Sequence, residues 1–196
     1  MKSWYRQSQA GPAFRAPLKG DGVEVDDFVA HPADAGGAPL ATKKTTDSNP
    51  DDPLPVWIMK MTQSAFSDAR DHLLSLPPEV AGILLGPVKD DLIVTHFIAD
   101  TEGKGSPASF TLNTRTLNRE LSKAKTCGLN CKGIVHSHPS GFIVPSSGDL
   151  AYLQRLFTRP ANSELTQFFM PIVCDGHFYP YVFAMGRIYS ADLYLI

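Results

Sequence analysis

Two histidines separated by a single residue, His136 and His138, follow the apolar stretch Gly133-Ile134-Val135 and precede Pro139. If this stretch is a strand, successive side chains alternate between its faces, so both imidazoles project the same way while Ser137 points oppositely. Pro139 removes a donor from the strand ladder and ends the strand there. The spacing therefore predicts two imidazoles at a strand end, near enough to each other to bind one metal ion.

The third ligand must come from elsewhere in the chain, and Asp149, at the start of the next predicted helix, is the candidate. A folded-back loop over residues 140–145 would bring its carboxylate opposite the imidazoles. Two neutral imidazoles and one carboxylate leave Zn²⁺ an open fourth position for water, as in hydrolytic zinc sites. The zinc acidifies that water, and a separate carboxylate must take its proton and pass it to a leaving group. Glu79, which follows Pro77-Pro78 at the start of an apolar strand, is the candidate for that role.

Each part of this constellation also has a simpler interpretation. Ser146-x-x-Asp149 is the pattern of a helix capping box, and Glu79 could be a solvated residue after a helix end. A rival, structural zinc site would combine Cys127 and Cys131 with one of the two histidines. The His-x-His spacing argues against it, because finger sites place about 3 to 5 residues between their histidines.

Taken together, these residues resemble a known motif: Glu79, then His136-Ser137-His138-Pro139, six residues, Ser146, two residues and Asp149. The order is similar to the JAMM motif, E…H-[ST]-H-P-x6-S-x2-D, of JAB1/MPN-domain metalloproteases, without a gap. The resemblance covers roughly residues 56–196. It implies that His136, His138 and Asp149 bind a catalytic zinc, that Glu79 is the general base and acid, and that Ser146 supports the tetrahedral intermediate. It also implies the cytidine-deaminase-like, three-layer α/β fold of that family.

The chain further resembles the prokaryotic JAB proteases, which are found beside ubiquitin-like proteins and their activating and conjugating enzymes, some of them in antiphage operons. Those proteases cleave isopeptide bonds or trim the C termini of ubiquitin-like proteins. The resemblance therefore implies a zinc-dependent, deubiquitinase-like isopeptidase or peptidase acting on a ubiquitin-like protein or its conjugates. Residues 135–141 with Pro145-Ser146 also resemble RadC proteins, so a RadC-like protein linked to DNA processing, or a non-catalytic MPN scaffold, is the alternative. The Glu79 strand favours the protease branch.

The elements that must position these residues follow from hydrophobic periodicity. Amphipathic spacing predicts helices over residues 63–76, 114–125 and 148–157. Apolar or alternating runs predict strands over residues 56–59, 79–86, 92–99, 109–112, 133–135, 168–174, 178–184 and 187–196. Asp175-Gly176 is predicted to join two of the last three strands as a tight hairpin turn. This order predicts the α/β class, with a mixed β-sheet flanked by helices.

Residues 1–55 differ in composition from the rest of the chain. They hold seven of the 16 prolines and no isoleucine, too little apolar surface to offset the entropy of ordering. We therefore expect a disordered or loosely docked tail over residues 1–55 and a JAB/MPN metalloprotease domain over residues 56–196. Within the tail, residues 23–29 alternate like a strand and could add to a sheet edge.

Charge and composition narrow the class of protein. The net charge of −2 offers no overall attraction for phosphate backbones or anionic lipid, which argues against nucleic acid as the main partner. No apolar run approaches the ~20 residues of a membrane span, and no secretory signal is visible at the start of the chain. Three cysteines are too few for a disulfide framework, so we expect a cytoplasmic protein. Arg115, Arg119 and Lys123 recur at helical spacing and are interpreted as the solvated face of their helix.

The loop between Pro139 and Ser146 is the expected place for the substrate. The extended C-terminal tail of a modifier would pair with strand-like backbone in this loop, which includes Ile143 and Val144. Gly141 and its surroundings are expected to leave a narrow channel that admits a Gly-Gly-like end and excludes bulky side chains.

Overall fold

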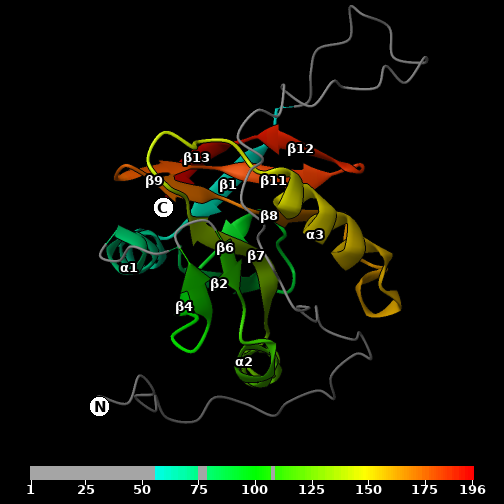
Figure 1. Cartoon of the computed structure of the whole chain (residues 1–196). Helices are drawn as coiled ribbons and strands as arrows, with labels where there is room; N and C mark the ends of the chain where they lie inside the picture. Colours follow the sequence, from blue (N-terminus) through cyan, green and yellow to red (C-terminus); the bar gives the residue numbers. More distant parts are fainter. Residues whose placement is uncertain (1–55, 75–78, 107–108) are drawn as a thin grey trace, which may run out of the picture.

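The computed structural model of the chain describes residues 56–74, 79–106 and 109–196. The predicted tail over residues 1–55, with its strand-like segment 23–29, lies outside the described residues, as does the Pro77-Pro78 pair. Figure 1 shows the described part as a sheet with helices on both sides.

Helices and strands alternate along the described chain. The helices are α1 (Gln63–Leu74), α2 (Thr114–Thr126), α3 (Ser147–Thr158) and a short 3₁₀ turn, η1 (Pro160–Asn162). The strands are β1 (Ile58–Met61), β2 (Ala81–Pro87), β3 (Ile93–Val94), β4 (His96–Ala99), β5 (Lys104–Ser106), β6 (Ser109–Thr111), β7 (Leu129–Ser137), β8 (Gln167–Phe169), β9 (Ile172–Cys174), β10 (His177–Tyr179), β11 (Tyr181–Ala184), β12 (Arg187–Ser190) and β13 (Asp192–Leu195).

Strand β7 lies in the interior of an eight-stranded mixed sheet. One of its edges pairs antiparallel with β2, whose other edge pairs with β4. The opposite edge of β7 pairs parallel with β8, where Gly133 lies beside Phe169, and then with β9, where His136 lies beside Ile172. Strands β10, β11 and β12 continue the sheet beyond them. A separate parallel sheet has the order β13-β1-β3, and β5 and β6 form a hairpin. The predicted α/β class with a mixed sheet is confirmed.

The last three predicted strands are each divided in two, which the prediction missed. Pro171 lies in the break between β8 and β9, and Pro180 separates β10 from β11. Proline has no N–H to donate to a ladder, so the strand cannot continue its pairing through either position. At Ala191 the chain passes from the large sheet to the small one, and the N–H of Asp192 donates to the carbonyl of Trp57. The predicted strand over residues 92–99 is likewise divided between β3 and β4.

Alternating side chains along β2 and β7 build one core on each face of the large sheet. Ile83 and Ile134 belong to a buried cluster that α2 and α3 cover. Their neighbours Leu84 and Val135 belong to a second cluster, which α1 and β1 cover. Figure 1 shows α1 and α3 on opposite sides of the sheet. Because side chains two residues apart share a face, His136 lies on the side of α2 and α3.

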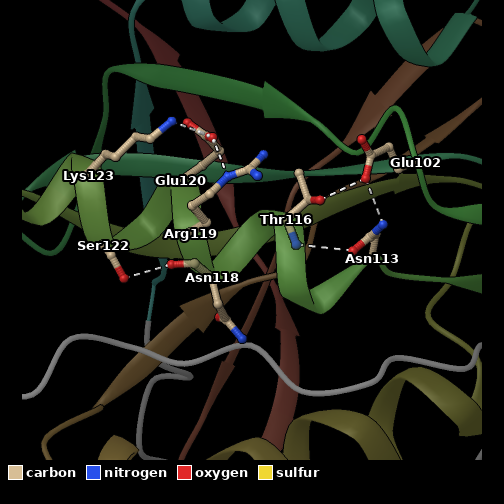
Figure 2. A network of polar contacts seen from close by, with 8 residues as sticks. All are labelled: Glu102, Asn113, Thr116, Asn118, Arg119, Glu120, Ser122 and Lys123. Carbon is tan, nitrogen blue, oxygen red and sulfur yellow. Dashed lines mark hydrogen bonds and ion pairs between the residues drawn. The ribbon is translucent and has the colours of Figure 1, made fainter.

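Helix α2 carries a network of polar contacts on its exposed surface (Figure 2). Asn113 caps its first turn by accepting a hydrogen bond from the N–H of Thr116 at 3.1 Å. Lys123 and Arg119 both pair with Glu120, at 2.8 and 3.4 Å. Such exposed pairs contribute little to stability, but they neutralise part of the basic stripe predicted on this helix. The stripe is a solvated helix face, as predicted.

Within residues 56–74, 79–106 and 109–196, no helix is both long enough and apolar enough to cross a membrane.

Candidate active site

The end of β7 presents the two predicted histidines. Both backbone N–H groups are held by the neighbouring segment: His136 donates to the carbonyl of Pro171 at 3.3 Å and His138 to that of Val173 at 2.9 Å. The His136 side chain is fully buried, and the His138 side chain is 7% exposed. Pairing on both edges of β7 therefore fixes the backbone from which the imidazoles project.

The first turn of α3 presents Asp149. The side chain of Ser146 accepts a hydrogen bond from the N–H of Asp149 at 3.1 Å, and Asp149 Oδ2 accepts one from the N–H of Ser146 at 2.6 Å. This reciprocal pair is the capping box anticipated from the sequence. Asp149 can both cap α3 and serve in the metal group, because the capping bond uses Oδ2 and leaves Oδ1 facing His136. Asp149 is fully buried.

His136, His138 and Asp149 converge on one point. The two imidazole Nε2 atoms lie 2.8 Å apart. Asp149 Oδ1 lies 3.3 Å from His136 Nε2, and Asp149 Oδ2 lies 3.5 Å from His138 Nε2. One potential ligand atom of each residue lies within 4.8 Å of the others. Among the described residues, His136, His138 and Asp149 thus form a group that could hold a metal ion.

The donor set fits zinc. Two ring nitrogens and one carboxylate oxygen are the ligands of catalytic zinc sites, which keep a further position open. His138 Nδ1 lies 2.9 Å from the backbone carbonyl oxygen of Phe142. A carbonyl can only accept, so Nδ1 carries the proton, and in the neutral imidazole Nε2 keeps its lone pair toward the site. A carbonyl partner on the second ring nitrogen is the usual support of a metal-binding histidine.

The buried carboxylate is held in its charged form. Burial alone would raise the pKa of Asp149, but His136 and His138 together lower it well below its usual range. Burial lowers the pKa of His138, but the hydrogen bond and charge of Asp149, the Phe142 carbonyl and the charge of Glu79 together raise it. The field of the buried Asp149 carboxylate therefore favours a positive charge at this point, as a metal cation would supply.

Glu79 lies beside this group. Just before β2 begins, the N–H of Ser137 donates to the carbonyl of Val80 at 2.9 Å, and the N–H of Val80 donates to Ser137 Oγ at 3.0 Å. The continued register puts Glu79 opposite His138, and strand alternation puts its side chain on the same face as the imidazoles. Burial raises the pKa of Glu79 to about 7, while His138 lowers it and Asp149 raises it. Glu79 is 8% exposed, so its interpretation as a solvated residue is wrong.

The rival cysteine site is not formed. Cys127 is exposed at the end of α2, whereas Cys131 is buried in β7. The Cys131 thiol lies 3.5 Å from the carbonyl of Gly133, to which it donates, and burial raises its pKa to about 12. A thiol held in its protonated form is a poor metal ligand, because metals bind the thiolate.

The loop after Pro139 departs from one expectation. Gly141 has φ +82°, and a Cβ built there would meet nothing within 4 Å. The glycine at this position therefore serves a turn that needs a positive φ, and the space beside its Cα is open where a narrow channel was expected. Phe142, Ile143 and Val144 are 47%, 41% and 61% exposed, so the loop presents three consecutive apolar side chains to solvent.

Three side chains that the sequence did not single out hold this loop. The Cys174 thiol donates to the carbonyl of Pro139 at 3.2 Å, and Asp175 Oδ2 accepts from the N–H of Gly141 at 3.0 Å. Farther along, the Tyr181 hydroxyl donates to the carbonyl of Ile143 at 3.0 Å. The Asp175-Gly176 hairpin turn was predicted, but its contact with the loop spans 34 residues and has no local signal in the sequence.

Comparison with solved structures finds similarity over about 70% of this chain. A protein of Desulfitobacterium hafniense is similar with a TM-score of 0.56 at 19% identity, covering 71% of this chain and 93% of that one. A protein of Salinibacter ruber gives 0.49 at 24% identity, covering 70% and 92%. A JAB1/MPN domain protein from Archaeoglobus fulgidus gives 0.41 at 18% identity, covering 71% and 100%.

Comparison of sequences identifies a family for this chain. No curated protein matches this sequence. Residues 62–185, however, match the family of prokaryotic homologs of the JAB domain. The matched range includes Glu79, both histidines, Ser146 and Asp149, and it extends over more than half of the chain. With a mixed sheet between helical layers and a buried His-His-Asp group at the end of its inner strand, the chain belongs to the family of prokaryotic homologs of the JAB domain.

Proposed function

We propose that this protein is a zinc-dependent isopeptidase or peptidase that releases a ubiquitin-like protein from conjugates or trims its C terminus. The single observation that carries the proposal is the convergence of His136, His138 and Asp149 on one point beside Glu79. A scaffold needs the fold alone, whereas this arrangement places a carboxylate of raised pKa beside a three-residue metal group.

His136, His138 and Asp149 would hold the zinc. When bound, zinc supplies Lewis acidity, lowering the pKa of water and polarising a carbonyl. The residues of the chain supply the rest of the site. Asp149 offsets part of the cation's charge, and the Phe142 carbonyl keeps the proton of His138 on Nδ1. The buried position of the three ligand side chains excludes bulk water from the far side of the centre.

Glu79 is the proposed proton carrier. With a pKa of about 7, it can accept a proton from the attacking water and return it to the nitrogen of the leaving amine. The C–O bond forms first and gives a tetrahedral intermediate; the C–N bond then breaks, and the products are a carboxylate and a free amine. Ser146 accepts the N–H of Asp149 through its oxygen, so its own O–H can donate to the oxygen of the tetrahedral intermediate. Both roles are those implied by the JAMM resemblance.

The substrate class rests on the resemblance and on the shape of the loop. Phe142, Ile143 and Val144 offer exposed apolar contacts beside the metal group. An extended tail could pair with the backbone of this loop and bring its last carbonyl to the centre. A ubiquitin-like protein is the proposed partner, with its activating and conjugating enzymes in the same cytoplasmic pathway.

Cleavage of a defined conjugate tests the proposal. The probe is a ubiquitin-like protein whose Gly-Gly terminus is joined to the side-chain amine of a lysine peptide. Zinc-loaded protein should release the intact modifier and the free peptide, as measured by mass spectrometry. The Glu79→Gln and His138→Ala variants should not.

Two outcomes would contradict the proposal. Binding to duplex DNA without cleavage of any conjugate would favour the RadC-like alternative. Equal cleavage by the Glu79→Gln variant would mean that the activity comes from a contaminant or another site. Neighbouring genes for a ubiquitin-like protein and its activating enzyme would independently favour the isopeptidase.

A further inference from the structure

The loop that follows the two histidines begins with a tight turn. The N–H of Phe142 donates to the carbonyl of Pro139 at 3.1 Å, and Gly141 occupies the third position of the turn with φ +82°. This is the geometry of a type II turn, which requires a positive φ at that position. The turn aims the carbonyl of Phe142 back at His138 Nδ1, 2.9 Å away.

The turn is held from outside by the hairpin between β9 and β10. Asp175 Oδ2 accepts the N–H of Gly141 at 3.0 Å. Hydrogen bonds from Ser140 and from Gly141 lower the pKa of Asp175, so its carboxylate is charged while it holds the turn. Beside it, the thiol of Cys174 donates to the carbonyl of Pro139 at 3.2 Å.

The hairpin does not need an aspartate at this position for its own sake. Asp175-Gly176 has φ values of 49° and 80°, the left-handed pair of a two-residue hairpin turn. Met185-Gly186, between β11 and β12, has φ values of 50° and 73° with an apolar residue in the equivalent place. The same backbone therefore forms without a carboxylate. What Asp175 adds is its bond to the loop.

We propose that Asp175 is a positioning residue for the metal ligand His138. It holds the Ser140-Gly141 turn, the turn holds the carbonyl of Phe142, and that carbonyl fixes the ring and proton of His138. Tyr181 supports the far side of the loop through the carbonyl of Ile143. The proposal rests on the metal group of the proposed function, but it does not depend on which bond is hydrolysed.

The test distinguishes the effect of the Asp175 carboxylate from that of the hairpin turn on which it lies. Asp175→Gly removes the carboxylate while glycine keeps the positive φ that the hairpin needs. Met185→Gly is the matched control, since it places a glycine at the equivalent turn position, where the native side chain has no carboxylate. Zinc affinity is measured on the full chain by competition with a chromophoric chelator. Outer partners of ligands typically change metal affinity 10- to 100-fold, so we expect Asp175→Gly to weaken zinc binding roughly tenfold and Met185→Gly to leave it unchanged.

Two measurements report on the contact between Asp175 and the loop in the absence of metal. At a pH where His138 is neutral in the metal-free protein, long-range ¹⁵N–¹H NMR spectra should show its proton on Nδ1, and Asp175→Gly should mix the two tautomers. The amide proton of Gly141 should exchange faster with solvent in the same variant. Asp175→Asn keeps the turn and one acceptor oxygen, so it should restore most of the wild-type zinc affinity. Tyr181→Phe should weaken it slightly.

Three results would overturn the proposal. One is unchanged zinc affinity and an unchanged His138 tautomer in Asp175→Gly. Another is an equal loss in Met185→Gly, which would mean that glycine in either turn loosens the sheet. The third is a loss of thermal stability in Asp175→Gly that accounts for the weaker zinc binding and that Asp175→Asn does not repair. Failure of the proposed function would look different: zinc binding and the tautomer would respond to Asp175 as described, while no conjugate is cleaved by the wild-type protein.

Discussion

Replacing Glu79 with glutamine should remove hydrolysis while keeping the zinc and the fold. The amide has the shape of the carboxylate and can still hydrogen-bond, but it cannot accept the proton that the attacking water must lose. Loss of a general base costs on the order of 10²–10⁴ in rate. Zinc content should not change, because the three proposed ligands are His136, His138 and Asp149.

The pKa of Glu79 determines how the rate of hydrolysis should depend on pH. Burial raises it from 4.5 to about 7 in the metal-free protein. From this pKa, about half of the Glu79 side chains are charged at pH 7, about a tenth at pH 6 and about nine tenths at pH 8. A bound cation would lower the pKa of Glu79, because it favours the carboxylate. The rate of the zinc-loaded protein should therefore rise with pH and level off at or below neutral pH.

The same shift predicts how the stability of the metal-free protein depends on pH. The pKa of Glu79 is higher in the folded state than in the unfolded state, so the folded state binds its proton more tightly. This contribution to the free energy of unfolding is fully present below about pH 4.5 and is lost as the pH rises through about 7. In Glu79→Gln, that part of the pH dependence should disappear.

The assay is an NMR titration of the Glu79 carboxyl carbon in the metal-free protein, followed by the same titration with zinc. The titration should be centred near pH 7 without metal and lower with it, and its signal should be absent from Glu79→Gln. A carboxyl that titrates near 4.5 in both states would refute the reasoning, because Glu79 would then be solvated. Unchanged conjugate turnover in Glu79→Gln would remove this residue from the mechanism.

Three other changes address the metal, the loop and the core. His138→Ala should contain no zinc by elemental analysis. At zinc concentrations 100 times the Kd, zinc should add about 2.7 kcal/mol to the free energy of unfolding of the wild-type protein and nothing to that of the variant. Full zinc in this variant, but none after loss of Cys127 and Cys131, would move the site to the cysteines. Ile143→Pro should weaken cleavage of a folded modifier conjugate with unchanged zinc content, since proline cannot donate a backbone hydrogen bond to a docked tail; equal cleavage would reject loop docking. Gly133→Ala should lower the free energy of unfolding by about 1–3 kcal/mol in denaturant titrations, because its Cβ would meet the backbone carbonyl of Phe169. An unchanged midpoint would mean that β7 and β8 can move apart to make room for the methyl group.

Local rules account for the parts of the fold that the sequence predicts well. Helices α2 and α3 begin and end within a residue or so of their predicted ranges, because apolar spacing and the caps Asn113 and Ser146 act over a few neighbouring residues. The His-x-His pair and the helix-start position of Asp149 depend on the same short-range rules. The long C-terminal strands were predicted poorly, because their breaks occur where Pro171 and Pro180 stop one pairing and the chain begins another.

The sequence by itself determined which side chains are available as metal ligands and on which elements they lie. Only the tertiary structure decided that they meet. Val80 pairs with Ser137 across 57 residues, and this register brings Glu79 opposite His138. Asp175 reaches Gly141 across 34 residues, and the cap of α3 turns Asp149 toward β7. Such contacts depend on the register of paired strands and on which face of the sheet a helix covers, and both are set by the packing of the whole core.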